Sequence, residues 1–284
     1  MIDNLPFRII RDLKPGSVFL VEDSRGERFV IKKSPAASRV VKFSRLVHQK
    51  GGELGEIMPV FNEKGKFLWQ KFLTWELAGD TVETYGIKRE AFPLINPEKL
   101  ARVISELQSF PFSDPTMDTR MADFYLKNTS EFREALTQEF SPEFADKVEQ
   151  FLRSQSSLVD KYSHFLANGD LHPQNIMYPP SPRLRRASQF MLVDWDLLHL
   201  NNPGWDLTDL YVWGWRDSSW QDRLLDTYKK VMPTPKSIFE KIFAFDVVYL
   251  TSQLIKHAKL IKAPKEFMDA QKKILLTHLE SHSE

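Results

Sequence analysis

The sequence has 284 residues, which is enough for one large domain or for two lobes with a sizeable buried core. Its 39 Lys and Arg residues nearly balance its 38 Asp and Glu residues, so the overall charge gives no drive toward nucleic acid or anionic membranes. Because the chain has no cysteine, disulfides, thiolate zinc sites and cysteine nucleophiles are excluded, and the composition fits a reducing compartment.

Targeting and membrane segments are also missing from the pattern. The N-terminal residues, MIDNLPFRII, lack the charged stretch followed by an apolar stretch that marks a secretory signal. No apolar run approaches the roughly 18 residues that a membrane span requires. We therefore expect a cytoplasmic protein.

The first part of the chain predicts an antiparallel sheet. Runs rich in β-branched and aromatic residues alternate with turns that contain glycine, which is typical of successive hairpins. Strand alternation places Lys32 and Lys33 on opposite faces, and the turn Lys14–Gly16, taken alone, indicates an ordinary hairpin. The predicted strands are Phe7–Leu13, Ser17–Glu22, Arg28–Lys32, Met58–Phe61 and Phe67–Leu77.

One helix interrupts the predicted strands. It covers Ser38–Lys50 and ends at Gly51 and Gly52, since glycine favours the backbone conformation at a helix C-terminus. No acidic residue occurs between Lys32 and Glu53. This helix therefore carries no carboxylate that could pair with Lys32.

The rest of the chain predicts mainly helices. In the first of them Leu100, Val103, Ile104 and Leu107 recur at the spacing of one buried face. The fold class that follows is α+β, with a small antiparallel sheet before a larger helical part. The predicted helical stretches are Pro97–Phe110, Met121–Leu136, Pro142–Phe165 and Ser237–His282.

Polar residues of one chemical kind gather beside two short apolar runs in the stretch 164–209. Asp170 and Asn175 lie before and at the start of the first run, and Asp194 ends the second. A carboxylate that orients a hydroxyl, with an amide and a second carboxylate on a metal, is the set that magnesium-dependent phosphoryl transfer needs. Each residue alone has a plainer explanation as a turn or capping residue. Their order and spacing favour the chemical one.

Three segments carry a resemblance to a known family. Asn168–Asn175, reading NGDLHPQN, resembles the H-G-D-x-H-x-x-N catalytic loop of the aminoglycoside phosphotransferase and choline kinase superfamily. Val193–Asp196 resembles its metal-binding I-D-[FW]-[DE] segment, and Pro203–Leu207 its D-P-x-x-D-L-A segment. The resemblance implies a bilobal, protein-kinase-like fold, with a nucleotide-binding lobe at 1–79 and a larger, mainly helical catalytic lobe at 80–284.

The resemblance also implies roles in the second lobe. Asp170 would be the catalytic base, and Asn175 and Asp194 would bind magnesium. Asp196 has three open roles: a second metal, the acceptor, or only the loop. Asp206 would brace the backbone of the catalytic loop. His172, which lacks a spaced partner for a metal site, fits a hydrogen-bonding loop histidine.

In the first lobe the resemblance implies a site for ATP. Lys32 matches the lysine that contacts the α and β phosphates, and the turn at Gly16 lies where a loop covers the phosphates. Thr74–Gly79 lies where the hinge between the lobes belongs, so backbone groups of Glu76 and Leu77 would read the adenine edge. A plain edge strand is the alternative for this segment.

Three departures from the family pattern define a rival hypothesis, and one of them is the single glycine, Gly16, in the turn expected over the phosphates. The family helix usually supplies a glutamate to the strand lysine, whereas here only Glu53 or Glu56 of the following segment could substitute. Asn168 replaces the usual histidine of the catalytic loop. A catalytically degenerate kinase-fold binding or structural protein, of the kind associated with spore coats, is therefore the alternative to an enzyme.

The predicted acceptor is the hydroxyl of a small molecule. Only 12 positions separate Asp194 from Asp206, too few for the activation segment of a protein kinase, and Gly169 replaces the arginine that would pair with a phosphate there. We expect no nucleic acid or membrane partner, and the sequence does not indicate the oligomeric state.

Two further groups of residues leave the acceptor open. An aromatic cage for a cationic acceptor and ordinary core packing are the alternatives for Trp205, Trp213, Trp215 and Trp220. A solvated loop and a site for an anionic acceptor are the alternatives for Pro179–Ser188, with Arg183, Arg185 and Arg186.

Overall fold

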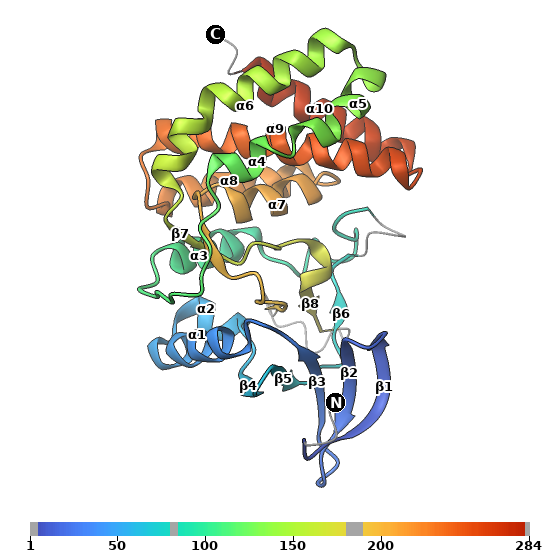
Figure 1. Cartoon of the computed structure of the whole chain (residues 1–284), viewed down its shortest axis with the longest axis vertical. Helices are drawn as coiled ribbons and strands as arrows, with labels where there is room; N and C mark the ends of the chain where they lie inside the picture. The colour runs from blue at the N-terminus through green and yellow to red at the C-terminus, as the bar shows by residue number, and fades with distance from the viewer. Residues whose placement is uncertain (1–4, 80–84, 180–189, 282–284) are drawn as a thin grey trace.

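The N-terminal lobe contains an antiparallel sheet of five strands, as the sequence predicts. The computed structural model describes residues 5–79, 85–179 and 190–281, and Figure 1 shows this sheet at one end and the helical lobe at the other. The strand order is β1-β2-β3-β5-β4. The strands are β1 (Arg8–Lys14), β2 (Val18–Glu22), β3 (Arg28–Lys33), β4 (Phe61–Lys64) and β5 (Phe67–Lys71).

Two predicted strand boundaries are wrong. The strand expected at Met58–Phe61 begins only at Phe61, because Pro59 has no N–H to donate to a neighbouring strand. The strand expected at Phe67–Leu77 stops at Lys71. Its last residues form β6 (Glu76–Leu77), which pairs antiparallel with a strand of the second lobe.

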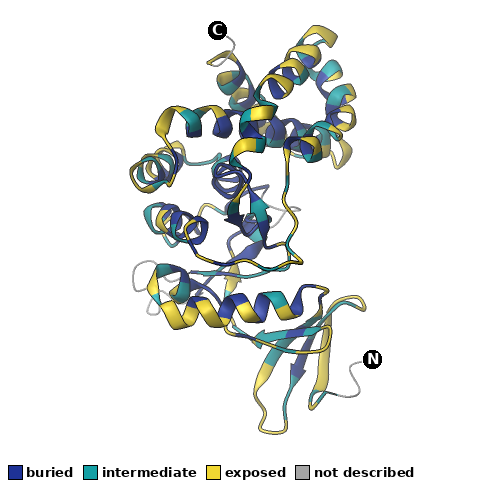
Figure 2. Cartoon of the chain, turned by 60° about the vertical axis from the view of Figure 1, so that its left-hand side comes forward, coloured by how far each residue is buried: buried dark blue, intermediate teal, exposed yellow. Residues whose placement is uncertain are grey.

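Helix α1 (Ala37–Lys50) packs against the sheet and also against the second lobe. It ends at Gly51, whose φ of 74° suits glycine, and α2 (Gly52–Ile57) follows. The ring of Phe43 lies 5.4 Å from that of Phe110 and 5.8 Å from that of Trp195. Figure 2 shows the buried side of α1 facing the rest of the molecule. The helix therefore connects the sheet to the segment that carries Asp194.

The C-terminal lobe is a group of helices around a large apolar core. The stretch predicted as one helix at Met121–Leu136 is divided near Asn128, whose side-chain Nδ2 donates to the carbonyl of Phe124. The helices are α3 (Pro97–Gln108), α4 (Ala122–Leu126), α5 (Thr129–Glu139), α6 (Pro142–Tyr162), α7 (Trp205–Trp213), α8 (Ser218–Val231), α9 (Lys236–Leu260) and α10 (Lys265–Glu280).

The tryptophans of this lobe belong to its core. Trp205, Trp213 and Trp220 are buried, and the indole N–H of Trp220 donates to the carbonyl of Ile95. Trp215 is partly buried, and its indole N–H donates to the carbonyl of Tyr85. These contacts favour the packing explanation over an aromatic cage.

Short strands between the lobes hold the polar segments side by side. Strand β7 (Phe165–Ala167) pairs with β10 (His199–Asn201), and β8 (Ile176–Tyr178) lies between β6 and β9 (Met191–Leu192). A turn of 3₁₀ helix, η2, occupies Pro173–Asn175. The segment after β7 and the segment after β9 are thereby brought to one place.

Some predicted features lie outside the described residues. These are the first residues assigned to the second lobe, 80–84, and the basic loop with Arg183, Arg185 and Arg186. Among the residues that the structure does describe, every helix is too short or too polar to cross a membrane.

Candidate active site

The loop after β7 is braced from below by Asp206 of α7. The backbone N–H of Asn168 donates to Asp206 Oδ2 at 2.7 Å, and that of Gly169 donates to Oδ1 at 2.9 Å. Burial raises the pKa of Asp206 to about 6, although these two hydrogen bonds lower it in part. Gly169 has a φ of 87°, and a Cβ there would lie 2.3 Å from the His199 ring. The bracing role expected for Asp206 is thus confirmed, and glycine is required beside it.

Asp170 and Asn175 are in direct contact. Asn175 Nδ2 donates to the Asp170 carbonyl at 2.7 Å and to its carboxylate Oδ2 at 3.1 Å, while His172 Nε2 lies 3.4 Å from Oδ1. Burial alone would raise the pKa of Asp170, but the hydrogen bonds from His172 and Asn175 outweigh it, so the net pKa is lowered. The carboxylate is therefore ionised at neutral pH and can accept a hydrogen bond from a hydroxyl.

Asp194 follows β9 in a conformation that is rare for a residue with a side chain. Its φ is 60°, in the left-handed region, which costs on the order of 1–3 kcal/mol for a residue other than glycine. The N–H of the preceding Val193 donates to the carbonyl of Asn175 at 2.9 Å. This hydrogen bond fixes Asp194 close to the catalytic loop.

Asn175 and Asp194 fit a magnesium ion that is also bound by phosphate. The Asn175 amide nitrogen is engaged by Asp170, which leaves the amide oxygen for a metal, and the Asp194 side chain is 46% exposed. No cluster of three His, Asp or Glu side chains suited to a metal occurs in the described part of the chain. Magnesium suits this small donor set, because it keeps waters and is bound by one or two protein ligands together with substrate phosphates.

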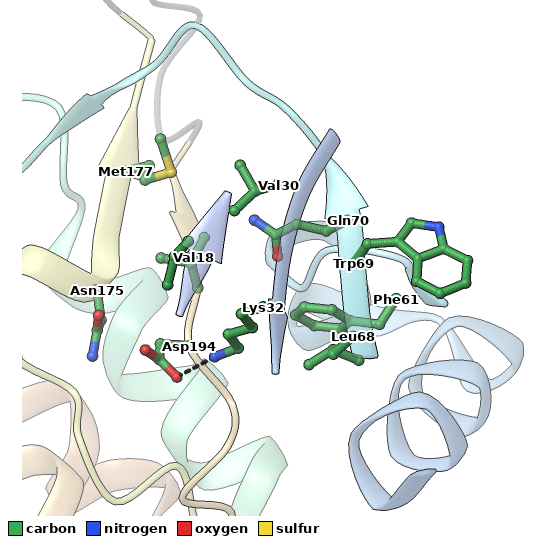
Figure 3. A pocket seen from close by; sticks show the side chains of 11 residues that line it. Val18, Val30, Lys32, Phe61, Leu68, Trp69, Gln70, Asn175, Met177 and Asp194 are labelled. Atoms are coloured by element: carbon green, nitrogen blue, oxygen red, sulfur yellow. Dashed lines mark hydrogen bonds and ion pairs between the residues drawn. The ribbon is translucent and has the colours of Figure 1, made fainter. Parts of the chain in front are cut away.

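A cavity between the lobes joins these residues to the sheet. Strand register puts Val18, Lys32 and Leu68 in one row of a single sheet face, and Val30 and Gln70 in the next row. Figure 3 shows Val18, Val30 and Lys32 on one side of this cavity and Met177 and Asn175 on the other. Its lining comprises Val18, Val30, Lys32, Phe61, Leu68, Trp69, Gln70, Asn175, Met177, Val193 and Asp194.

The catalytic-loop geometry, the cavity and the sheet agree with the family comparison. Residues 15–238 match the family model of the phosphotransferase enzyme family, which is more than half of the chain. This chain belongs to the phosphotransferase enzyme family. No significant match occurs among curated protein sequences.

Solved structures share the fold of this phosphotransferase at low sequence identity. Choline kinase LicA from Streptococcus pneumoniae has 11% identity and a TM-score of 0.56, over 99% of this chain and 96% of its own. An aminoglycoside phosphotransferase from Alicyclobacillus acidocaldarius has 16% identity and a TM-score of 0.57, over 96% and 91%. An AMP-bound spectinomycin phosphotransferase has 13% identity and a TM-score of 0.56, over 98% and 93%. They confirm the predicted bilobal, protein-kinase-like fold class.

Lys32 of this phosphotransferase is paired with two carboxylates from the segment after β9. Its Nζ lies 2.7 Å from Asp194 Oδ1 and 3.0 Å from Asp196 Oδ2. Burial raises the pKa of Asp196, and the attraction of Lys32 offsets this only in part. The lysine selected from the sequence therefore meets the predicted metal segment, and Lys33 lies on the other face of β3, opposite Phe67.

The two glutamates considered as substitutes for a helix acid have other partners. Glu53 accepts from Arg102 at 2.8 Å, and Glu56 accepts from Lys99 at 2.7 Å. Both basic residues lie on α3. Neither glutamate pairs with Lys32, so the idea that one of them replaces the missing acid is wrong.

Three residues predicted to contact nucleotide lie outside the lining of the cavity. The N–H of Gly16 donates to the Asp12 carboxylate at 3.0 Å and closes an ordinary turn. Glu76 accepts from the Tyr178 hydroxyl at 3.0 Å, and Leu77 is 39% exposed. Glu76 and Leu77 form β6, which pairs with β8. Their contact with adenine remains a prediction.

Sequence reasoning missed several residues around this site. Val18, Val30 and Met177 form the apolar walls of the cavity, and strand alternation from Lys32 would have found Val30. Arg39 of α1 donates to the carbonyl of Asp196 at 3.2 Å and to that of Thr116 at 2.6 Å. No local sequence pattern predicts these contacts, because Arg39 is far in the sequence from Thr116 and Asp196.

Proposed function

We propose that this phosphotransferase is an ATP- and magnesium-dependent enzyme that acts on the hydroxyl of a small molecule. The observation that carries the proposal is the convergence of Lys32, Asn175 and Asp194 on one cavity with apolar walls, with Asp170 in contact with Asn175. Apolar walls suit the nucleotide base, an ammonium group suits the phosphates, and two oxygen ligands suit the magnesium ion that accompanies them. AMP is bound in a spectinomycin phosphotransferase of similar fold, which supports use of an adenine nucleotide.

Each group then has a role in transfer. Asn175 and Asp194 would hold the magnesium ion, which when bound neutralises phosphate charge. Val18, Val30 and Met177 would enclose the base. Asp170 would orient the acceptor hydroxyl, whose oxygen bonds to the γ-phosphorus as the bond to the ADP oxygen breaks. The hydroxyl proton would pass late to the ionised carboxylate of Asp170.

A small acceptor agrees with the connection between the metal segment and α7. From Asp194 the chain passes through β10 directly into α7 at Trp205. This leaves no extended segment on which a protein substrate could dock. The named substrates of similar structures, choline and spectinomycin, are also small hydroxylated molecules. We extend only this class of acceptor to the present chain.

The rival hypothesis is a catalytically degenerate binding or structural protein of this fold. It rested on the missing helix acid, the single glycine of the turn at Gly16, and Asn168. For the first of these, Lys32 has Asp194 and Asp196 as partners in the structure instead. These ion pairs support the enzyme hypothesis, since a lysine held at the cavity can bind the phosphates of a nucleotide.

A thermal-shift titration is the first test. ATP, GTP and ADP are added with and without magnesium to the wild type and to Asp194→Asn, and transfer from ATP to a panel of hydroxylated acceptors is then measured. The proposal predicts stabilisation by ATP that requires magnesium and is lost in Asp194→Asn, followed by acceptor-dependent formation of ADP. Stabilisation without transfer would favour the non-catalytic alternative, and no stabilisation by any nucleotide would overturn the proposed enzyme and leave the degenerate, non-catalytic protein.

A further inference from the structure

The carboxylates that contact Lys32 lie in the segment after β9 and not on helix α1. Helix α1 has no acidic residue, so it offers no carboxylate to Lys32. The two carboxylates that contact Lys32, those of Asp194 and Asp196, lie two residues apart. The question is which of them keeps Lys32 in place once a nucleotide and its metal are bound.

The two carboxylates differ in their surroundings, which suit one to a metal and the other to Lys32. Asp194 lines the cavity and is 46% exposed, so its carboxylate is available to a metal. Asp196 does not line the cavity, and its side chain is only 21% exposed. With magnesium bound, the Asp194 carboxylate would serve the metal, because a divalent ion competes for it more strongly than the Lys32 ammonium group does. Among the carboxylates that the structure describes, Asp196 would then be the one left to pair with Lys32.

Asp196 is poorly explained as a residue that only stabilises the fold. Its Oδ1 is buried and accepts no hydrogen bond of ordinary geometry among the described residues, although the nearby Ser34 hydroxyl acts to lower the pKa of the carboxyl. A buried carboxylate with one unpartnered oxygen usually costs stability, so the contribution of Asp196 to stability does not explain why it is there. Its Oδ2 lies 3.0 Å from the ammonium group of Lys32, so the charge of Asp196 can hold that lysine in place.

Helix α1 also contacts Asp196, but at its main chain and not at its carboxylate. Arg39 NH2 donates to the Asp196 carbonyl at 3.2 Å, and Arg39 NH1 donates to the Thr116 carbonyl at 2.6 Å. The helix thus fixes the backbone that carries the acid.

We infer that Asp196 is the positioning residue that holds Lys32 against the nucleotide phosphates, in place of an acid on helix α1. The inference rests on the proposed function, because it needs a nucleotide in the cavity. It assigns Asp196 neither to a second metal nor to the acceptor. A positioning pair must act as a unit, so removing either member removes the same contact.

A double-mutant cycle tests this inference. Binding of ADP and of adenosine in magnesium is measured by calorimetry for the wild type, Lys32→Met, Asp196→Asn and the double variant. Each single variant should weaken ADP about tenfold, and the double variant should lose little more than either one. Adenosine affinity should not change, since adenosine has no phosphates. Glu22→Gln is the matched control, because Glu22 pairs with Arg8 and Arg28 on the same sheet.

The outcomes separate the two proposals. If the wild type does not bind ADP, the proposed function fails. If the wild type binds ADP but the losses in the two single variants add, or if Asp196→Asn binds ADP like the wild type, the positioning role is overturned. An equal loss of adenosine and ADP binding in Asp196→Asn would also overturn it, because it would show a structural effect. Melting temperatures of all variants verify that each is folded.

Discussion

The two sides of the cavity are built differently. On the catalytic-loop side, buried hydrogen bonds from the backbone N–H groups of Asn168 and Gly169 to Asp206 hold the loop, and the sequence keeps most of the family motif, with Asn168 in place of its histidine. On the sheet side, strand β1 is exposed along its whole length, its turn has one glycine, and the helix acid is missing. The comparison teaches that chemistry depends on a rigid loop that tolerates little change, whereas phosphate can be held by charged side chains in more than one arrangement.

The largest effect is expected on the loop side, at the base. Asp170→Ala should lower kcat by about 10²- to 10⁴-fold, because the hydroxyl loses its proton acceptor. Nucleotide binding in magnesium should change little, since Asp170 does not line the cavity. Steady-state kinetics and calorimetry measure the two quantities. Unchanged turnover in a folded variant would remove Asp170 from the mechanism.

The next effect tests the rigidity of the loop. Asp206→Ala leaves the buried N–H groups of Asn168 and Gly169 without an acceptor, so the free energy of unfolding should fall by about 3 kcal/mol. Asp206→Asn keeps one acceptor oxygen and should lose less. Urea denaturation measures both variants. Equal stability of Asp206→Ala and the wild type would show that the loop does not need this brace.

The stability of the catalytic-loop side should depend on pH through Asp209, a buried residue of α7. Burial raises the pKa of Asp209 to about 7. A raised pKa in the folded state gives stability that is present at low pH and is lost as the pH rises toward that value. Asp209→Asn removes this loss. The melting temperature of the variant minus that of the wild type should therefore be larger at pH 8 than at pH 5. The same difference at both pH values would contradict the shift.

The smallest effect is expected on the sheet side. Lys14 pairs with Val18, which pairs with Lys32, so the register places all three on one sheet face. Lys14→Ala should weaken ADP about threefold, as expected for an exposed charge near phosphate. Lys33→Ala is the matched control, because Lys33 lies on the opposite face and should leave ADP affinity as it is. Equal losses in the two variants would show that only overall charge matters.

Local patterns predicted most of the fold and the loop side of the site. Glycine turns and strand alternation were enough for the sheet of five strands, and helical spacing was enough for α3 and α6. The spacing of Asp170, Asn175 and Asp194 indicated the loop side, because that chemistry is encoded in short segments. The break between α4 and α5 and the end of β5 depend on tertiary contacts, so pattern alone misplaced them.

The sheet side was harder to predict because its contacts join distant segments. Lys32 and Asp196 are 164 positions apart, and no spacing rule relates them. The same holds for Arg39, which donates to two backbone carbonyls, a group that every residue has, and to the Thr116 hydroxyl. The search for a replacement acid stopped at Glu53 and Glu56, since they follow the helix in sequence, although α3 binds both.

The packing of Phe43 has a consequence for how the molecule unfolds. Although Phe43 precedes the expected lobe boundary near residue 79, its ring is enclosed by Phe110, Phe112 and Trp195 from beyond that boundary. A fragment that ended there would expose this ring to water and lose about 3–5 kcal/mol of packing. The two lobes therefore share one apolar core, and we predict a single transition in calorimetry of the whole chain.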